Sequence, residues 1–278
     1  MELDIDHLRG WIGATRESRD TISPRLAGSL AAVLDEPCAL APGDAAPAGI
    51  QWCLCPDIAP MSGLGPDGHP GRGGFLPPVQ LPRRMWAGGE LRFSGDFRVG
   101  DEVVRLSRVA DVAVKSGRSG ELCFVTVMHD YATPRGPTLS ERHDIVYRAL
   151  SPTLPPTAPP AAMPAPDESH AVAATPVLLM RYSAASLNGH RIHYDRVYCR
   201  DEELYPGLIV HGPLQASFLL RLACRRADGH LPELFSFRGI APLFDGPDFS
   251  INGLREGDHD RLWVADAGGR VTMEAQAR

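Results

Sequence analysis

Hydrophobic positions at the start of the chain follow a helical spacing and then change to the pattern of β-strands. Ile5, Leu8 and Trp11 recur on one helical face, and Ser23 before Pro24 combines an N-cap with a proline at the first helical position. After a stretch rich in glycine and proline, apolar or alternating segments rich in Val, Ile, Phe and Thr predict strands. These segments span residues 91–99, 101–117, 122–132 and 142–150.

The second half of the chain shows the same order of elements in a more compact form. Residues 177–184 have a strand-like apolar pattern, and the apolar periodicity of 213–226 predicts a helix. Three candidate strands then close the chain, at 235–244, 260–267 and 270–277. A helix followed by antiparallel strands in both halves predicts an α+β fold with each helix laid on a sheet.

A proline-rich segment separates the two halves. Seven of the 26 prolines lie between Pro152 and Pro166. Because proline fixes φ and lacks an N–H, this segment should neither pair into a sheet nor continue a helix. We therefore predict an extended linker over 151–175, between an N-terminal domain (1–150) and a C-terminal domain (176–278).

Composition and charge exclude several classes of protein. The net charge of -6 argues against a nucleic-acid surface, which needs a concentrated basic stripe. The first eleven residues lack the features of a secretory signal, and no apolar run is long enough to span a bilayer. The six cysteines show no zinc-site spacing. We expect a cytoplasmic protein with free thiols and no nucleic-acid or membrane partner.

The densest group of potential catalytic residues lies within 188–195, which reads NGHRIHYD. His193 could act as a base without any large shift of its pKa, and the Asn188 amide could hold a water without exchanging a proton. Five residues apart on an unbroken helix, their side chains would diverge by about 140°. They converge only if the segment turns, which Gly189 permits.

Two other interpretations of this group remain. Polar loops often carry His and Asn for turn formation and hydration, although this density of chemical groups makes a purely structural role less favoured. His190 and His193 could instead bind a metal, because residues three apart share a helical face. No third ligand or HExxH pattern accompanies them, so we expect no metal.

A second candidate is the start of the helix at 213–226. Pro213 fits the first helical position, and Gly212 before it lets a ligand approach the backbone. The free N–H groups and the positive end of the helix dipole make this start a candidate oxyanion hole, with the Gly212 N–H as donor. Glycine before proline is also common at turns and at the boundaries of helices and strands, so this signal for an oxyanion hole is weak by itself.

The remaining motifs say less about function. Residues 65–75 are glycine-rich but lack the G-x-G-x-x-G spacing and the following helix of a nucleotide-binding loop. Arg84 and Trp86 are candidates to contact an anionic cofactor, although a solvated arginine pair at 83–84 is an equally good interpretation.

Several strings in both halves resemble the MaoC-like acyl-thioester hydratases and dehydratases. In the second half these are RYSAASLNGHRIHYDR and YPGLIVHGPLQASFLL; in the first half they are LGPDGHPGRGGFLPPVQLPRRMWAGG and ERHDIVYR. The branch that they resemble includes hydroxyacyl-thioester dehydratase type 2 and the hydratases of itaconyl-CoA and mesaconyl-C4-CoA. The resemblance implies a double hot dog, in which each half wraps an antiparallel sheet around a long helix, with the catalytic groups in the second half.

The resemblance also implies residue roles. The family motif is Asp-x-Asn-x-x-His, which places Asn188 at the Asp position, His190 at the Asn position and His193 at the catalytic His. Gly212 matches the oxyanion glycine. Asn188 is a departure, because an amide cannot carry a proton. His193 must then do more of the proton transfer, or Asp195 or Tyr194 must help.

These implications together predict a hydro-lyase that adds water reversibly to an α,β-unsaturated acyl-CoA and needs no further cofactor. A dicarboxylic monothioester, mesaconyl-C4-CoA or itaconyl-CoA, is the expected substrate and citramalyl-CoA the product, with Arg191 or Arg84 pairing the second carboxylate and His190 and Trp86 also lining the substrate site. The alternatives are a 3-hydroxyacyl-ACP or -CoA dehydratase of fatty acid metabolism and a non-catalytic acyl-thioester-binding module. A monomer or a homodimer would fit equally well.

Overall fold

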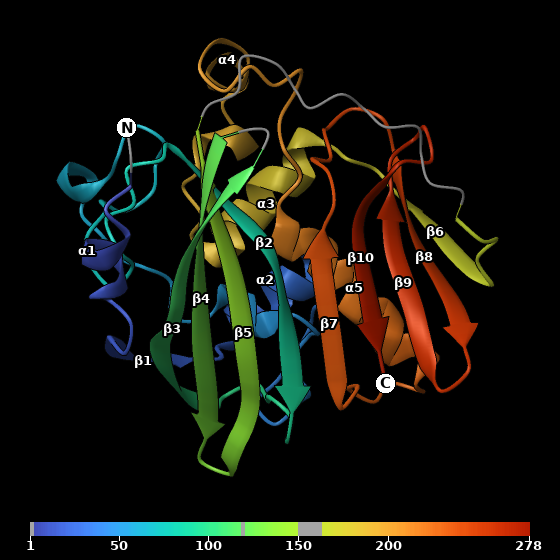
Figure 1. Cartoon of the computed structure of the whole chain (residues 1–278). Helices are drawn as coiled ribbons and strands as arrows, with labels where there is room; N and C mark the ends of the chain where they lie inside the picture. The colour runs from blue at the N-terminus through green and yellow to red at the C-terminus, as the bar shows by residue number, and fades with distance from the viewer. Residues whose placement is uncertain (1–2, 118–119, 150–162) are drawn as a thin grey trace.

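The computed structural model describes residues 3–117, 120–149 and 163–278. Its centre is one ten-stranded sheet with the strand order β1-β3-β4-β5-β2-β7-β10-β9-β8-β6. Every neighbouring pair in that order is antiparallel. The helices α2, α3 and α5 lie behind the sheet in the view of Figure 1, so that one face of the sheet covers them.

The N-terminal half supplies strands β1 to β5. Its elements are α1 (Ile5–Arg9), β1 (Thr15–Thr21), α2 (Pro24–Val33), the 3-10 turns η1 (Ile50–Cys53) and η2 (Met61–Gly63), β2 (Arg83–Phe93), β3 (Glu102–Gly117), β4 (Gly120–Thr133) and β5 (Gly136–Arg148). The Ser23 side chain accepts from the Leu26 N–H, so the predicted cap of α2 is confirmed.

The C-terminal half supplies strands β6 to β10 in the same internal order. Its elements are β6 (Glu168–Val172), α3 (Pro176–Ser186), η3 (Arg191–His193), α4 (Arg196–Asp201), α5 (Gly212–Arg226), β7 (Leu234–Gly239), β8 (Phe249–Glu256), β9 (His259–Ala265) and β10 (Val271–Ala277). Each half therefore forms the same five-stranded unit, which is the arrangement expected of a double hot dog.

The two units join where β2 pairs with β7, from Gly88 opposite Arg238 to Arg92 opposite Leu234. The glycines at this seam leave room for backbone on the neighbouring strands. A Cβ on Gly88 would lie 2.6 Å from the Phe237 carbonyl oxygen, and one on Gly89 would lie 2.2 Å from that of Arg142. Only glycine allows strands to approach this closely.

The largest hydrophobic core runs through both halves, so the two units fold around shared packing. Leu214, Leu219 and Leu220 of α5 are completely buried. The structure corrects the expectation of a long helix in each half. α5 has 15 residues, whereas α2 has ten and packs against α3, and among the described residues only the 3-10 turns η1 and η2 lie between α2 and β2.

Residues 177–184 are helical, which corrects their strand-like interpretation. α3 begins at Pro176, and the Thr175 side chain caps it by accepting from the Leu178 N–H. This is the same cap-and-proline signal as at Ser23, and it overrides an apolar run whose type is ambiguous from periodicity alone. The buried residues Leu179, Tyr182 and Ala185 recur every third position, on one helical face.

The end of the predicted linker is also corrected. Residues 168–172 form β6, an edge strand that pairs with β8, although no strand was expected between 151 and 175. The prolines end at Pro166 and resume at Pro176, so this short segment keeps every N–H that a ladder needs. Residues 151–162 of the predicted linker lie outside the described residues. In the described part of the chain, no helix is both long and apolar enough to cross a bilayer.

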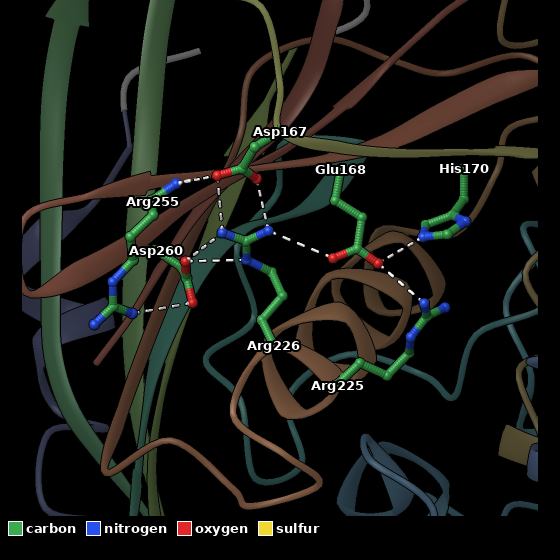
Figure 2. A network of polar contacts seen from close by, with 7 residues as sticks. All are labelled: Asp167, Glu168, His170, Arg225, Arg226, Arg255 and Asp260. Carbon is green, nitrogen blue, oxygen red and sulfur yellow. Dashed lines mark hydrogen bonds and ion pairs between the residues drawn. The ribbon is translucent and has the colours of Figure 1, made fainter.

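A network of charged side chains fastens β6 and the segment before it to the end of α5 (Figure 2). Arg226 lies at its centre, 2.6 Å from Asp167 and 2.9 Å from Asp260. The neighbouring Arg225 lies at the edge of the network and pairs with Glu168 at 3.0 Å. Arg226 therefore has a structural role inside the protein.

Exposure distinguishes the two arginines energetically. The side chains of Arg226 and Asp260 are 13% and 6% exposed, whereas that of Arg225 is 49% exposed. Arg226→Ala should lower the free energy of unfolding by about 3 kcal/mol, because it leaves the Asp260 carboxylate buried with a weaker partner. Arg225→Ala should cost less than about 1 kcal/mol. Urea denaturation followed by circular dichroism measures both, and equal losses would contradict the central position of Arg226.

Candidate active site

The loop after α3 turns back on itself and places its histidines inside the protein. Leu187 has a left-handed backbone (φ 50°) at the end of the helix. The Asn188 Oδ1 then accepts from the His190 N–H at 3.0 Å, and the Tyr194 hydroxyl donates to the Gly189 carbonyl at 3.1 Å. This turn leads into η3, at the end of which lies His193. The predicted turn at Gly189 is therefore present.

His193 is held as a neutral base. Its Nδ1 lies 2.7 Å from the Ile209 carbonyl oxygen, which can only accept, so Nδ1 carries the proton and Nε2 keeps a free lone pair. Burial lowers the pKa of His193 to about 4, against the opposing effect of the Ile209 hydrogen bond. The imidazole is consequently neutral at pH 7 and able to accept a proton.

A second histidine, His211, supports His193 from one side. The two rings stack with centroids 3.5 Å apart and an interplanar angle of 18°. His211 is completely buried, and its Nε2 lies 2.9 Å from the Ser183 hydroxyl of α3. Burial, followed by the nearby His193, lowers the pKa of His211 well below its ordinary value. Sequence analysis missed this support, because its only local signal is a histidine next to Gly212.

The start of α5 follows His211 directly. His211 is the N-cap residue and the helix begins at Gly212, so Pro213 is the second helical residue, one position later than predicted. Among the described residues, no backbone acceptor takes the Gly212 N–H, which leaves it free for a ligand. Trp86 packs against this glycine, since a Cβ on Gly212 would lie 3.0 Å from the indole Cε3. The stacked pair of His193 and His211 thus brings the predicted base next to the predicted oxyanion donor.

The predicted arginines have different positions. Arg191 is engaged: its guanidinium pairs with Asp195 at 2.8 Å, donates to the Pro66 carbonyl and covers the Tyr198 ring. Asp195 also caps α4, and Tyr194 is 52% exposed. The structure therefore gives Asp195 and Tyr194 structural contacts in place of the compensating role considered for them.

Arg84 lies on β2 at the wall of a cavity of about 290 Å³. Arg16 and Arg72 also line this cavity, but each is engaged, Arg16 with Asp57 and Arg72 with backbone carbonyls. Among the described residues Arg84 forms no ion pair, and its charge helps to lower the pKa of His69, after burial and against Asp67. Arg83 is buried and pairs with Glu203, so the interpretation of 83–84 as a solvated pair is wrong at Arg83.

A loop of the N-terminal half completes the site. His69 and His190 have ring centroids 4.1 Å apart, and His190 and His193 follow at 5.6 Å. The Asp67 carboxylate holds His69 through its Nδ1 at 2.9 Å and its backbone N–H at 3.0 Å. The glycine-rich segment 65–75, which showed no recognisable function in the sequence, thus brings two polar side chains to the predicted catalytic loop.

Asp67, His69 and His190 have donor atoms within 4.8 Å of one another. Such proximity also occurs in metal sites, but here both Asp67 oxygens already accept hydrogen bonds from His69. Burial opposes ionisation of Asp67, yet the hydrogen bond and charge of His69 outweigh it and hold the pKa of the carboxyl far below its usual range. We therefore interpret the pair as an ionised carboxylate that orients an imidazole.

Comparison with known proteins gives the family of the chain. The hydroxyacyl-thioester dehydratase type 2 family matches residues 49–245, a range that contains every predicted catalytic residue. The chain belongs to this family. It is 40% identical to the mesaconyl-C(4)-CoA hydratase of Chloroflexus aurantiacus over 267 residues, which are 95% of each chain. A dehydratase is a hydro-lyase, so the predicted family and enzyme class are confirmed.

Solved structures of the wider family share the fold. A MaoC-like dehydratase from Phytophthora capsici superposes with a TM-score of 0.71 and 13% identity, covering 99% of this chain and 97% of the other. A Mycobacterium tuberculosis protein described as a double hot dog gives a TM-score of 0.56 at 16% identity, over 96% and 95% of the two chains. The predicted double hot dog of this family member is confirmed.

The low pKa of His193 makes a prediction about pH. A base must be neutral to accept a proton, so activity is lost as the pH falls through the pKa of the folded protein. Because burial lowers that pKa to about 4, kcat/KM should stay nearly constant from pH 8 to about 5 and fall only below that. Initial rates across this range, with circular dichroism to verify folding, test it; half-maximal activity near pH 6.5 would contradict it.

Proposed function

We propose that this family member is an acyl-CoA hydratase that adds water to mesaconyl-C4-CoA or itaconyl-CoA and forms citramalyl-CoA. The observation that carries the proposal is the fixed tautomer of His193, which has a basic Nε2 on a ring stacked against His211, the residue directly before Gly212 at the start of α5. The 40% identity to a mesaconyl-C(4)-CoA hydratase over nearly the whole chain supports the choice of substrate.

The geometry suggests the following chemistry. With mesaconyl-C4-CoA, whose alkene is conjugated to the thioester, His193 Nε2 takes one proton from water while the oxygen bonds to Cβ, and the alkene electron pair moves to the thioester oxygen as an enolate. The His193 imidazolium then returns that proton to Cα, and the thioester carbonyl re-forms. The water is thereby divided between the two alkene carbons, and the enzyme regains its starting state without a further cofactor. Itaconyl-CoA, whose alkene is conjugated to its free carboxylate instead, would first need a proton shift that converts it to mesaconyl-C4-CoA.

The start of α5 has the features needed to stabilise the enolate. The Gly212 N–H is free, and the helix dipole places partial positive charge at this end. Pro213 has no N–H of its own, so Gly212 is the donor nearest the helix start. Losing one donor of this kind typically costs about 10²–10³ in rate.

Arg84 is our candidate for the second carboxylate of the substrate. It lines the cavity of about 290 Å³ and lies beside the Tyr147 hydroxyl. After burial, its positive charge helps to lower the pKa of both His69 and His190. Arg191 is a weaker candidate because its guanidinium already pairs with Asp195. His190 and Trp86 would complete the walls of the site, on either side of the reacting groups.

The alternatives make different demands on the protein. A fatty acyl dehydratase needs an apolar tunnel in place of an unpaired cation, and a non-catalytic binding module needs no fixed histidine tautomer. We propose further that the enzyme works in the reducing cytoplasm, which agrees with its six free thiols, as a monomer or homodimer.

His193→Ala tests the proposed base. The variant should fold normally and lose nearly all turnover, by roughly 10²–10⁴-fold, because no other group removes the proton from water. The assay follows the ultraviolet absorbance of the conjugated thioester with mesaconyl-C4-CoA and crotonyl-CoA, and the formation of citramalyl-CoA by chromatography with itaconyl-CoA. Unchanged turnover would exclude His193 as the base. A wild-type protein that binds these thioesters without converting any of them would support a binding module.

Arg84→Met tests the proposed carboxylate contact. It should lower kcat/KM for mesaconyl-C4-CoA by about 10–100-fold, since a charge-assisted hydrogen bond contributes roughly 1.5–3 kcal/mol. Crotonyl-CoA, which has no second carboxylate, should be affected much less. Arg92→Met is the matched control, because Arg92 lies on the same strand but is exposed and pairs with Glu90. Equal losses with both substrates would point to the CoA phosphates instead.

A further inference from the structure

Asn188 leaves one position of the catalytic motif without a proton acceptor. In the family motif a carboxylate stands there and holds the water together with the histidine. The Asn188 Oδ1 is engaged by the His190 N–H, and its remaining amide hydrogens can only donate. A water held by His193 alone would rotate about that single hydrogen bond, so a second acceptor is needed to direct its lone pair at Cβ.

His190 is placed to be that acceptor. Its ring lies between those of His69 and His193, at 4.1 Å and 5.6 Å between centroids. The His190 backbone is fixed by the Asn188 turn, yet within the described residues its ring nitrogens form no hydrogen bond with protein. An imidazole with two free nitrogens beside the catalytic base can accept from a ligand on one side and donate on the other.

Asp67 and His69 have the chemistry needed to fix the tautomer of His190. Asp67 accepts from His69 Nδ1, which leaves the lone pair on His69 Nε2. Donor atoms of all three residues lie within 4.8 Å of one another. No hydrogen bond joins the two rings among the described residues, so the influence of His69 on His190 is electrostatic. A lone pair on His69 Nε2 favours a proton on the nearer His190 nitrogen, and the other nitrogen then keeps the lone pair required to accept from water.

Close backbone packing holds the two loops together. The Arg191 N–H donates to the Asp67 carbonyl at 2.9 Å, and Arg191 also reaches the Pro66 carbonyl. Gly68 has a left-handed backbone (φ +88°), and a Cβ there would lie 2.0 Å from the Gly189 carbonyl oxygen. Only glycine fits between the loops, so the position of His69 relative to His190 is determined by the backbone.

We propose that His190, oriented by Asp67 and His69 of the N-terminal half, is the second acceptor for the reacting water, in the place of the carboxylate that Asn188 replaces. One water hydrogen is transferred to His193 and then to Cα, as described above. The other hydrogen stays on the oxygen, becomes the product hydroxyl and is held by His190 throughout. Asp67 and His69 are positioning residues, and the inference rests on the proposed hydratase function.

His69→Phe and Asp67→Asn test the proposal. The first keeps a packed ring without nitrogens, and the second removes the charge while keeping the shape. Each should lower kcat for mesaconyl-C4-CoA by about 10–100-fold, with a smaller change in KM, since the loss falls on orientation of the water. Asp201→Asn is the control, because Asp201 is 51% exposed and pairs with Arg200. It should leave kcat unchanged.

Rescue separates positioning from a purely structural role. Adding Asn188→Asp to His69→Phe returns a carboxylate to the family position. The double variant should have a kcat at least tenfold higher than that of His69→Phe alone. Folded variants with unchanged kcat, or a loss that Asn188→Asp does not restore, would overturn the proposal while an active wild type leaves the hydratase function standing. A wild-type protein that is inactive on every enoyl-CoA would contradict both the hydratase function and the proposed role of His190.

Discussion

The backbone contact between β2 and β7 brings the two halves of this enzyme close enough to share one site. Gly88 and Gly89 carry no side chain, and the strands therefore hydrogen-bond as neighbours in one continuous sheet. β2 also carries Arg84 and Trp86, and Trp86 packs against Gly212 at the start of α5. The seam thus fixes the N-terminal wall of the site relative to the C-terminal catalytic groups.

Burial determines the electrostatics of the site. His193, His190 and His211 are all shifted toward the neutral form, mainly because a charged imidazole would lose its solvation. The shifts reinforce each other, since neighbouring histidines cannot all be protonated at close range. Neutral rings can then be oriented by hydrogen bonds, as Ile209 orients His193. A row of neutral imidazoles supplies acceptors for water without introducing charge next to the substrate.

Charged groups instead hold the scaffold or line a cavity. Arg226 fastens the end of α5 to the segment around β6, far along the sheet from the seam (Figure 1, Figure 2). Arg84 is left without an ion pair among the described residues, at a cavity that the glycine-rich segment also lines, from Pro70 to Pro77. This separation suits a reaction in which the enzyme moves a proton but the substrate brings the charge.

Local signals in the sequence determined much of the fold and the C-terminal part of the site. The cap and proline at 23–24, the apolar stretch of α5, and the alternation in β3, β4 and β9 are short-range patterns that tertiary packing reinforces. The resemblance to the family motif likewise pointed to His193 and Gly212 as candidates, because both lie in short segments whose backbone surroundings are local. Long-range pairing decided the rest. The edge strand β1 alternates only between exposed and half-buried positions, so it has no hydrophobic signal and exists through its partner β3. Asp67 and His69 are separated from His190 by more than 100 residues. The joined sheet and the close contact between Gly68 and Gly189 bring them together.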